Sequence, residues 1–134
     1  MSVESTERIA GYHFTIRVSG HTIQADVPQK LGGGDNAPDP HDYMVSALAG
    51  CTVITMQMYA NLKGIPLESA DVRIRITEEG KDGNRIERDI QLKGELTEEQ
   101  RQRLLQIAER CPIHNFLQRG ATIQSQLVAE HAAT

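Results

Sequence analysis

Two cysteines carry the most reactive side chains in this sequence. Cys51 lies in the apolar run MVSALAGCTVITMQMYA, and Cys111 lies sixty residues later in ERCPIHNFL. A thiolate is a nucleophile, so two thiols can form a reversible redox pair. Four interpretations of Cys51 are open: a small core residue, half of a structural disulfide, a metal ligand, or a nucleophile. The first is common, because a free cysteine often packs as a small hydrophobic residue.

A zinc site would need further ligands at a suitable spacing. Cys111 and His114 form a Cys-x-x-His pair. Cys51 and His41 would complete a set of four ligands. Cys51, however, has no second ligand three or four residues away, and this disfavours a metal site. The segment LGGGD is better explained as a flexible loop than as a phosphate cradle, because no Gly-x-x-x-x-Gly-Lys pattern follows it.

The composition is that of an ordinary globular protein and disfavours several function classes. A net charge of −4 gives no basic face of the kind that binds nucleic acid. No apolar run reaches the roughly 18 residues of a membrane span, and MSVESTERIAG lacks the features of a signal peptide. We therefore expect a cytoplasmic protein without a nucleic acid or membrane partner. In a reducing cytosol, a permanent structural disulfide is unfavourable.

The apolar run is predicted to be a long buried helix. Asp39 is a good N-cap, Pro40 suits the first helical position, and Gly64 suits the C-cap. From Met44 to Tyr59 the chain is apolar on nearly every side, as in a helix that is buried all round. One small sheet could not cover such a helix, so we expect a second subunit to bury the rest.

Alternating apolar and polar residues predict strands elsewhere in the chain. The expected strands cover residues 12–18, 21–27, 71–77, 85–96 and 121–129. The first two and the next two read as antiparallel hairpins, although Glu87 to Asp89 interrupt the alternation in the fourth strand. Together with the helices, this order is typical of a single α+β domain over residues 1–134, with a mainly antiparallel sheet.

A second helix is expected to lead to the second cysteine. It begins at a capping box formed by Thr97 and Gln100 and continues to Cys111, where Pro112 interrupts it. One or two further helical turns follow, up to Gly120. On this interpretation Cys111 sits at the wrong end of a helix for activation by the helix dipole.

The segments PDPHDYMVSALAGCTVITMQMYA and IAERCPIHNFL together resemble the two cysteine motifs of the OsmC/Ohr family, the osmotically induced and organic-hydroperoxide-resistance proteins. The resemblance runs from about Tyr12 to Leu127. It implies an OsmC-like fold in which two chains intertwine as a homodimer. The long central helices would pack together between antiparallel sheets, and the active sites would lie at the subunit interface.

The resemblance also implies a thiol-dependent peroxidase that reduces organic hydroperoxides. Cys51 would be the peroxidatic thiol, which attacks the peroxide and becomes a sulfenic acid. Cys111 would be the resolving thiol, which then forms a disulfide with it. An external dithiol reductant would reset the pair, and no cofactor is implied. Two alternatives stay open: a non-catalytic binding protein of the same fold, and a redox sensor whose disulfide alters the dimer without turnover.

Members of the family are known for an arginine, held by a glutamate, beside the reactive thiol. This chain has His41 where the glutamate commonly stands, and Asp42 follows it. Asp42 lies nine residues before Cys51, which on a straight helix is a rise of roughly 13 Å. By position Arg8 is the first candidate for the arginine, and Arg17 is the second. The candidate site residues beside the cysteines are therefore His41, Asp42, Arg8 and Arg17.

Overall fold

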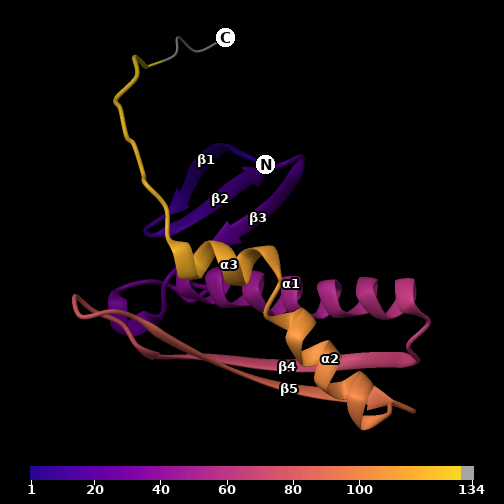
Figure 1. The fold of residues 1–134 in the computed structure, drawn as a ribbon. Coiled ribbons are helices and arrows are strands. Elements are labelled where there is room, and N and C mark those ends of the chain that lie inside the picture. Colours follow the sequence, from indigo (N-terminus) through magenta and orange to yellow (C-terminus); the bar gives the residue numbers. More distant parts are fainter. Residues whose placement is uncertain (131–134) are drawn as a thin grey trace.

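The computed structural model describes residues 1–130, which form two antiparallel sheets and three α-helices (Figure 1). The strands are β1 (Val3–Ala10), β2 (His13–Val18), β3 (His21–Ala25), β4 (Leu67–Glu78) and β5 (Arg85–Gly94). The helices are α1 (Pro40–Lys63), α2 (Glu98–Ala108) and α3 (Pro112–Arg119), with a short 3-10 helix at Gln29–Leu31. This mixture confirms the predicted α+β class.

The first sheet has the strand order β1-β2-β3. β2 and β3 form the predicted hairpin, with Ile16 opposite Ile23 and a turn at Ser19 and Gly20, both at positive φ. The sequence does not predict β1, because its residues are mostly polar, and all of them are exposed in the structure. Backbone pairing with β2 holds it in place. Figure 1 shows this sheet on the other side of α1 and α3 from β4 and β5.

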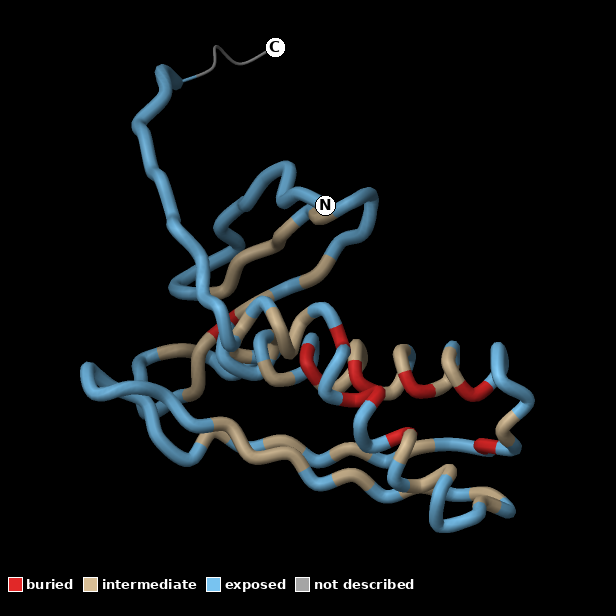
Figure 2. The backbone as a smooth tube through the Cα atoms, in the orientation of Figure 1, coloured by how far each residue is buried: buried red, intermediate tan, exposed pale blue. Residues whose placement is uncertain are grey.

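The second sheet, β4 paired with β5, provides one wall of the core. Apolar side chains of α1 and α2 pack over it and exclude water, which is the main stabilising contribution in a domain of this size. The buried core residues are Met56, Ala60, Leu67, Leu104, Ile107 and Ala108. Figure 2 shows that the buried positions of α1 lie on its side toward β4 and α2.

Both ends of α1 follow the sequence prediction. The Asp39 side chain accepts a hydrogen bond from the backbone of His41, and Asp42 completes a capping box by accepting from the Asp39 backbone at 3.0 Å. Pro40 occupies the first helical turn. At the other end Gly64 adopts the left-handed conformation of a C-cap.

Within this chain α1 is covered on one side only. Leu48, Thr52, Met56 and Ala60 are buried, whereas Ile54, Met58 and Leu62 are 55%, 68% and 80% exposed. The single chain thus leaves open the apolar side that the sequence predicts to be buried. Among the described residues, α1 also has the length and hydropathy of a membrane span, but core helices of soluble proteins pass the same test.

The second cysteine belongs to a different helix end from the one predicted. α2 begins at the predicted Thr97–Gln100 capping box but ends at Ala108, so Cys111 is not part of it. Cys111 is instead the N-cap of α3, and Pro112 occupies the first turn. The expectation that Cys111 ends a helix is therefore wrong. Proline favours this arrangement because it lacks the N–H that a first-turn residue leaves unpaired.

The predicted last strand is also wrong for the described chain. Residues 121–130 form neither helix nor strand and are exposed, including the apolar Ile123 and Leu127. Their alternation satisfies the local pattern of a strand, but a strand also needs a neighbour to accept its backbone hydrogen bonds. The described residues provide no such neighbour for this segment.

The loop between β3 and α1 folds around the buried carboxylate of Asp26. This carboxylate accepts from the backbone and side chain of Asn36, at 3.0 and 3.1 Å, and from the backbone of Val27, at 2.7 Å. These hydrogen bonds, led by the Asn36 backbone, lower the pKa of Asp26 because they favour its charged form. Gly33 fits the loop because a Cβ there would lie 2.1 Å from the Val27 carbonyl oxygen. Hydrogen bonds thus hold the LGGGD segment in a defined loop.

Gly33→Ala is expected to destabilise the domain by about 1–3 kcal/mol, because the added methyl group must displace the backbone of Val27. Urea unfolding followed by circular dichroism measures this change. Gly80→Ala is the matched control, since a Cβ at Gly80 meets no heavy atom within 4 Å. Equal losses of stability in the two variants would contradict the close packing of this loop.

Candidate functional site

The two cysteines meet between α1 and the start of α3. Cys51 is half-buried in the middle of α1, Cys111 is fully buried, and both are free thiols. The two thiols are near enough for each to change the pKa of the other. The structure therefore brings together the two cysteines that the sequence singles out, both as free thiols.

The N-terminus of α3 acts on both sulfur atoms. The backbone N–H of His114 donates to Cys111 Sγ at 3.3 Å. The backbone N–H of Ile113, next to it, lowers the pKa of both thiols. Thr55 Oγ1 lies 3.9 Å from Cys51 Sγ, one turn along α1. First-turn amides carry the positive end of a helix dipole and favour a negative sulfur. The two thiols thus share a favourable helix end.

The surroundings shift the pKa values of the two thiols in opposite directions. Burial raises the pKa of Cys51, but the hydrogen bonds from Cys111, Ile113 and Thr55 and the charge of Arg88 outweigh it, so the pKa is lowered overall. Burial also raises the pKa of Cys111, and the neighbouring Cys51 raises it further. Cys51 is therefore the thiol that ionises first, and Cys111 stays protonated.

The cation beside the pair is Arg88, which the sequence did not single out. Its guanidinium donates to Thr52 Oγ1 at 3.0 Å and to His114 Nδ1 at 3.1 Å. Thr52 is fully buried and donates in turn to the carbonyl of Leu48. Arg88 lies in phase with Ile86 on β5, so a charged residue occupies the apolar side of the strand. The interrupted alternation at residues 87–89 was the one signal of this in the sequence.

The arginines proposed from the sequence lie elsewhere in the chain. Arg8 Nε donates to the carbonyl of Gly11 at 3.0 Å, and Arg17 Nη1 donates to Thr22 Oγ1 at 3.4 Å. Both belong to the sheet of β1, β2 and β3. Among the described contacts of this chain, neither arginine reaches a cysteine.

The two residues at the position of the family glutamate serve the start of α1. The Asp42 carboxylate accepts a hydrogen bond from the Asp39 backbone and forms part of the capping box of α1. His41 Nε2 pairs with Glu79 Oε2 at 2.9 Å, and this hydrogen bond and the charge of Glu79 raise the pKa of His41. Within the described chain, neither Asp42 nor His41 contacts a thiol.

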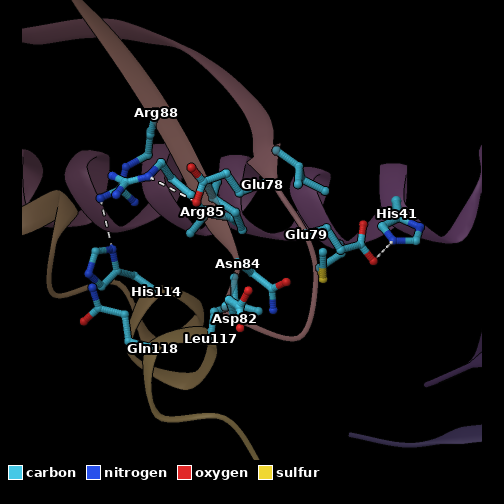
Figure 3. Close-up of a pocket in the computed structure, with 15 residues that line it drawn as sticks. His41, Glu78, Glu79, Asp82, Asn84, Arg85, Arg88, His114, Leu117 and Gln118 are labelled. Carbon is cyan, nitrogen blue, oxygen red and sulfur yellow. Dashed lines mark hydrogen bonds and ion pairs between the residues drawn. The ribbon is translucent and has the colours of Figure 1, made fainter.

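A cleft of about 1020 Å³ extends from His41 and Glu79 to Arg88 and His114. Figure 3 shows the pair His41–Glu79 at one end and the pair Arg88–His114 at the other. Apolar side chains complete the lining: Met44 and Leu48 from α1, Ile76 and Ile86 from the second sheet, and Leu117 from α3. Arg88 and His114 thus belong both to the cleft and to the thiol site.

A metal centre has no support in the part of the chain that the structure describes. No three side chains among its histidines, cysteines, aspartates and glutamates are grouped so that they could hold a metal ion. His41 and His114 face opposite ends of the cleft, so the four-ligand zinc set considered from the sequence does not assemble.

Comparison with solved structures supports the fold. A putative osmotic stress induced and detoxification response protein from Psychrobacter arcticus is 18% identical with a TM-score of 0.71, covering 86% of this chain and 87% of that chain. An OsmC-like protein from Mycoplasma pneumoniae is 22% identical with a TM-score of 0.68, covering 79% of each chain. An organic hydroperoxide resistance protein OsmC from Legionella pneumophila is 20% identical with a TM-score of 0.62, covering 87% of this chain and 89% of that chain.

No curated protein matches the sequence. The family model of OsmC-like proteins does match it, over residues 32–126, a range that includes α1, the second sheet, both cysteines and α3. This match covers most of the chain, and the confirmed α+β architecture agrees with it. The protein therefore belongs to the family of OsmC-like proteins.

Proposed function

We propose that this protein is a thiol-dependent peroxidase that reduces organic hydroperoxides through Cys51 and Cys111. The observation that carries the proposal is that Cys51 of α1 and Cys111 at the start of α3 lie together, close to Arg88 and to the first-turn amides of α3. These groups lower the pKa of Cys51. A peroxidatic cysteine must be a thiolate, and a resolving cysteine must be close enough to form a disulfide with it. The family and the name of the relative from Legionella pneumophila are compatible with this function.

In the first step the Cys51 thiolate attacks the distal oxygen of the hydroperoxide. An S–O bond forms and the O–O bond breaks, so sulfur is oxidised to a sulfenic acid and the peroxide is reduced to an alkoxide. The sulfenic acid keeps the proton of the hydroperoxide, and the alkoxide takes a proton from water. Arg88 supports this step because its positive charge favours the Cys51 thiolate.

In the second step Cys111 attacks the sulfur of the sulfenic acid. The S–S bond forms, and the departing hydroxide leaves as water after gaining the proton that Cys111 releases. The first step prepares the second, since a sulfenic acid no longer has the negative charge by which Cys51 raises the pKa of Cys111. The amides of His114 and Ile113 still lower that pKa. An external dithiol, oxidised to its own disulfide, would then restore both thiols.

The apolar lining of the cleft favours organic hydroperoxides over hydrogen peroxide. Five apolar side chains could remove an alkyl group from water, and this contributes about 25 cal/mol per Å² of buried apolar surface. They are Met44, Leu48, Ile76, Ile86 and Leu117. Hydrogen peroxide has no such group and would gain nothing from this lining.

The alternatives differ from this proposal in what the thiols do. A non-catalytic binding protein would be favoured by separated cysteines without a nearby cation, and the two thiols here lie together beside Arg88. A redox sensor would form the same disulfide but would not be reset through repeated cycles. Turnover with a dithiol therefore separates the sensor from the enzyme.

We also propose that two copies associate through the open side of α1. Ile54, Met58 and Leu62 form an exposed apolar row there, with Cys51 on the same side of the helix. Contiguous exposed apolar surface of this kind marks an interaction site. A homodimer would bury the row, and a cytoplasmic location would give the thiols access to dithiol reductants.

Cys51→Ser is expected to lower hydroperoxide consumption to the rate of the uncatalysed reaction, because serine cannot supply the nucleophilic thiolate. Without a dithiol, Cys111→Ser is expected to consume one equivalent of hydroperoxide per chain and to stop at the sulfenic acid, whereas the unaltered protein ends as the disulfide. Consumption of cumene hydroperoxide with excess dithiothreitol measures turnover for Cys51→Ser and the unaltered protein, and dimedone added without dithiothreitol traps the sulfenic acid of Cys111→Ser. The proposal fails if both thiols of the unaltered protein survive excess hydroperoxide, and oxidation without repeated turnover would indicate the sensor.

Arg88→Met is expected to raise the pKa of Cys51, because it removes the positive charge that favours the thiolate. Thiolate absorbance at 240 nm, followed against pH in a Cys111→Ser background, measures the change. Arg75→Met is the control, since Arg75 lies on the same hairpin but pairs with Glu87 and Asp89. An equal shift in both variants would mean that overall charge, and not the position of Arg88, acts on the thiol.

The double variant Ile54→Glu and Met58→Glu is expected to have the mass of one chain, 14.8 kDa, in light scattering, where the unaltered protein has twice that mass. Facing carboxylates and lost apolar contact would both disfavour association. Leu105→Glu on α2 is the control, because Leu105 is also exposed but lies outside the row on α1. A monomeric unaltered protein would refute the proposed dimer.

A further inference from the structure

The hydrogen bond from Arg88 determines which nitrogen of the His114 ring carries a proton. Arg88 Nη2 lies 3.1 Å from His114 Nδ1. A guanidinium can only donate hydrogen bonds, so Nδ1 must accept and cannot carry a proton. The ring is therefore neutral, and its proton is on Nε2. Arg88 thus leaves His114 with one fixed donor, Nε2–H, on the edge of the ring away from the guanidinium.

His114 lies where the thiol site adjoins the cleft. His114 follows Ile113, whose backbone N–H lowers the pKa of Cys51, and its own backbone N–H donates to Cys111. The His114 side chain lines the cleft together with Arg88 (Figure 3). One residue therefore contacts the thiol pair through its backbone and the space for substrate through its ring.

We propose that His114 is a catalytic residue, whose Nε2–H donates a hydrogen bond to the peroxide oxygen that leaves as the alkoxide. This inference deepens the proposed peroxidase function and rests on it. As the Cys51 thiolate forms the S–O bond and the O–O bond breaks, negative charge develops on the alkoxide oxygen. A fixed donor aimed at developing charge stabilises the transition state more than the ground state.

His114 acts here as a neutral donor and keeps its proton. Loss of the Nε2 proton would leave an imidazolate, which Arg88 could not protonate because a guanidinium does not give up a proton in proteins. The alkoxide therefore takes its proton from water, and the sulfenic acid keeps the proton of the hydroperoxide. Removal of one such donor typically lowers a rate by about 100- to 1000-fold in acyl transfer. A loss of roughly 10- to 100-fold is expected for the more exposed site here.

The test compares two reactions of Cys51 that need the same thiolate but release different leaving groups. Stopped-flow oxidation by tert-butyl hydroperoxide releases an alkoxide, whereas alkylation by iodoacetamide releases iodide, which needs no hydrogen-bond donor. His114→Leu is expected to slow the oxidation by roughly 10- to 100-fold and to leave alkylation within about twofold. His114→Gln keeps an N–H donor and is expected to recover part of the loss. Each variant keeps the backbone N–H that Cys111 accepts.

Three results would overturn the inference. Equal slowing of both reactions in His114→Leu would make His114 a support for the thiolate only. Unchanged oxidation in His114→Leu, or a rate for His114→Gln as low as that of His114→Leu, would remove the role of the Nε2–H donor. Should the leucine variant fail to fold, ¹⁵N NMR of the unaltered protein reads the tautomer directly, and a proton on Nδ1 would refute the assignment. Thiols of the unaltered protein that resist hydroperoxide altogether would refute the peroxidase proposal itself, whatever the variants do.

Discussion

A negative sulfur atom in a half-buried position needs donors for its charge, and several elements of this fold must meet to supply them. Desolvation alone favours the neutral thiol at Cys51. The compensating groups are the thiol of Cys111, the backbone N–H of Ile113, the hydroxyl of Thr55 and the guanidinium of Arg88. They come from α1, β5 and the start of α3, and no single element supplies all of them. The relative positions of these three elements therefore decide whether the thiol ionises.

Arg88 has the converse requirement, because it is a charge on the apolar side of β5. Thr52 and His114 accept its hydrogen bonds. The Thr52 hydroxyl in turn donates to the backbone carbonyl of Leu48 in α1. A partly buried cation and a partly buried thiolate each reduce the desolvation cost of the other. The hydrogen bond from Arg88 also orients the imidazole of His114, which lines the cleft. Arg88 therefore lowers the pKa of Cys51 by its charge and holds the His114 ring in place by its hydrogen bond. β5 is thereby linked both to the centre of α1 and to the first turn of α3.

The parts of this arrangement that depend on local chemistry could be predicted from the sequence. Asp39, Pro40 and Gly64 mark the ends of α1 because caps act within one turn, and the two cysteine motifs indicate the family. The position of Cys111 could also have been predicted locally, since a proline in a first helical turn makes the preceding residue an N-cap.

The role of Arg88 could not be predicted from the sequence, because its partners Thr52 and His114 are 36 and 26 residues away along the chain. Residues 121–129 fail for a different reason. Their alternation is that of a strand, but the described chain has no neighbouring strand for them to pair with.

The side of α1 on which Cys51 lies connects the proposed dimer to the proposed chemistry. Helical spacing places Cys51 on the same side as Ile54 and Met58, at the boundary between the surface covered by α3 and the open apolar row. A second copy that covered this row would remove further water from the sulfur, which opposes ionisation, but it would also strengthen the attraction of Arg88 in a less polar medium. The hydrogen-bond donors belong to the chain itself and would remain in place. With the open row closed, the cleft that Arg88 and His114 line would remain next to the thiol site, and on this side a donor for the leaving oxygen is available.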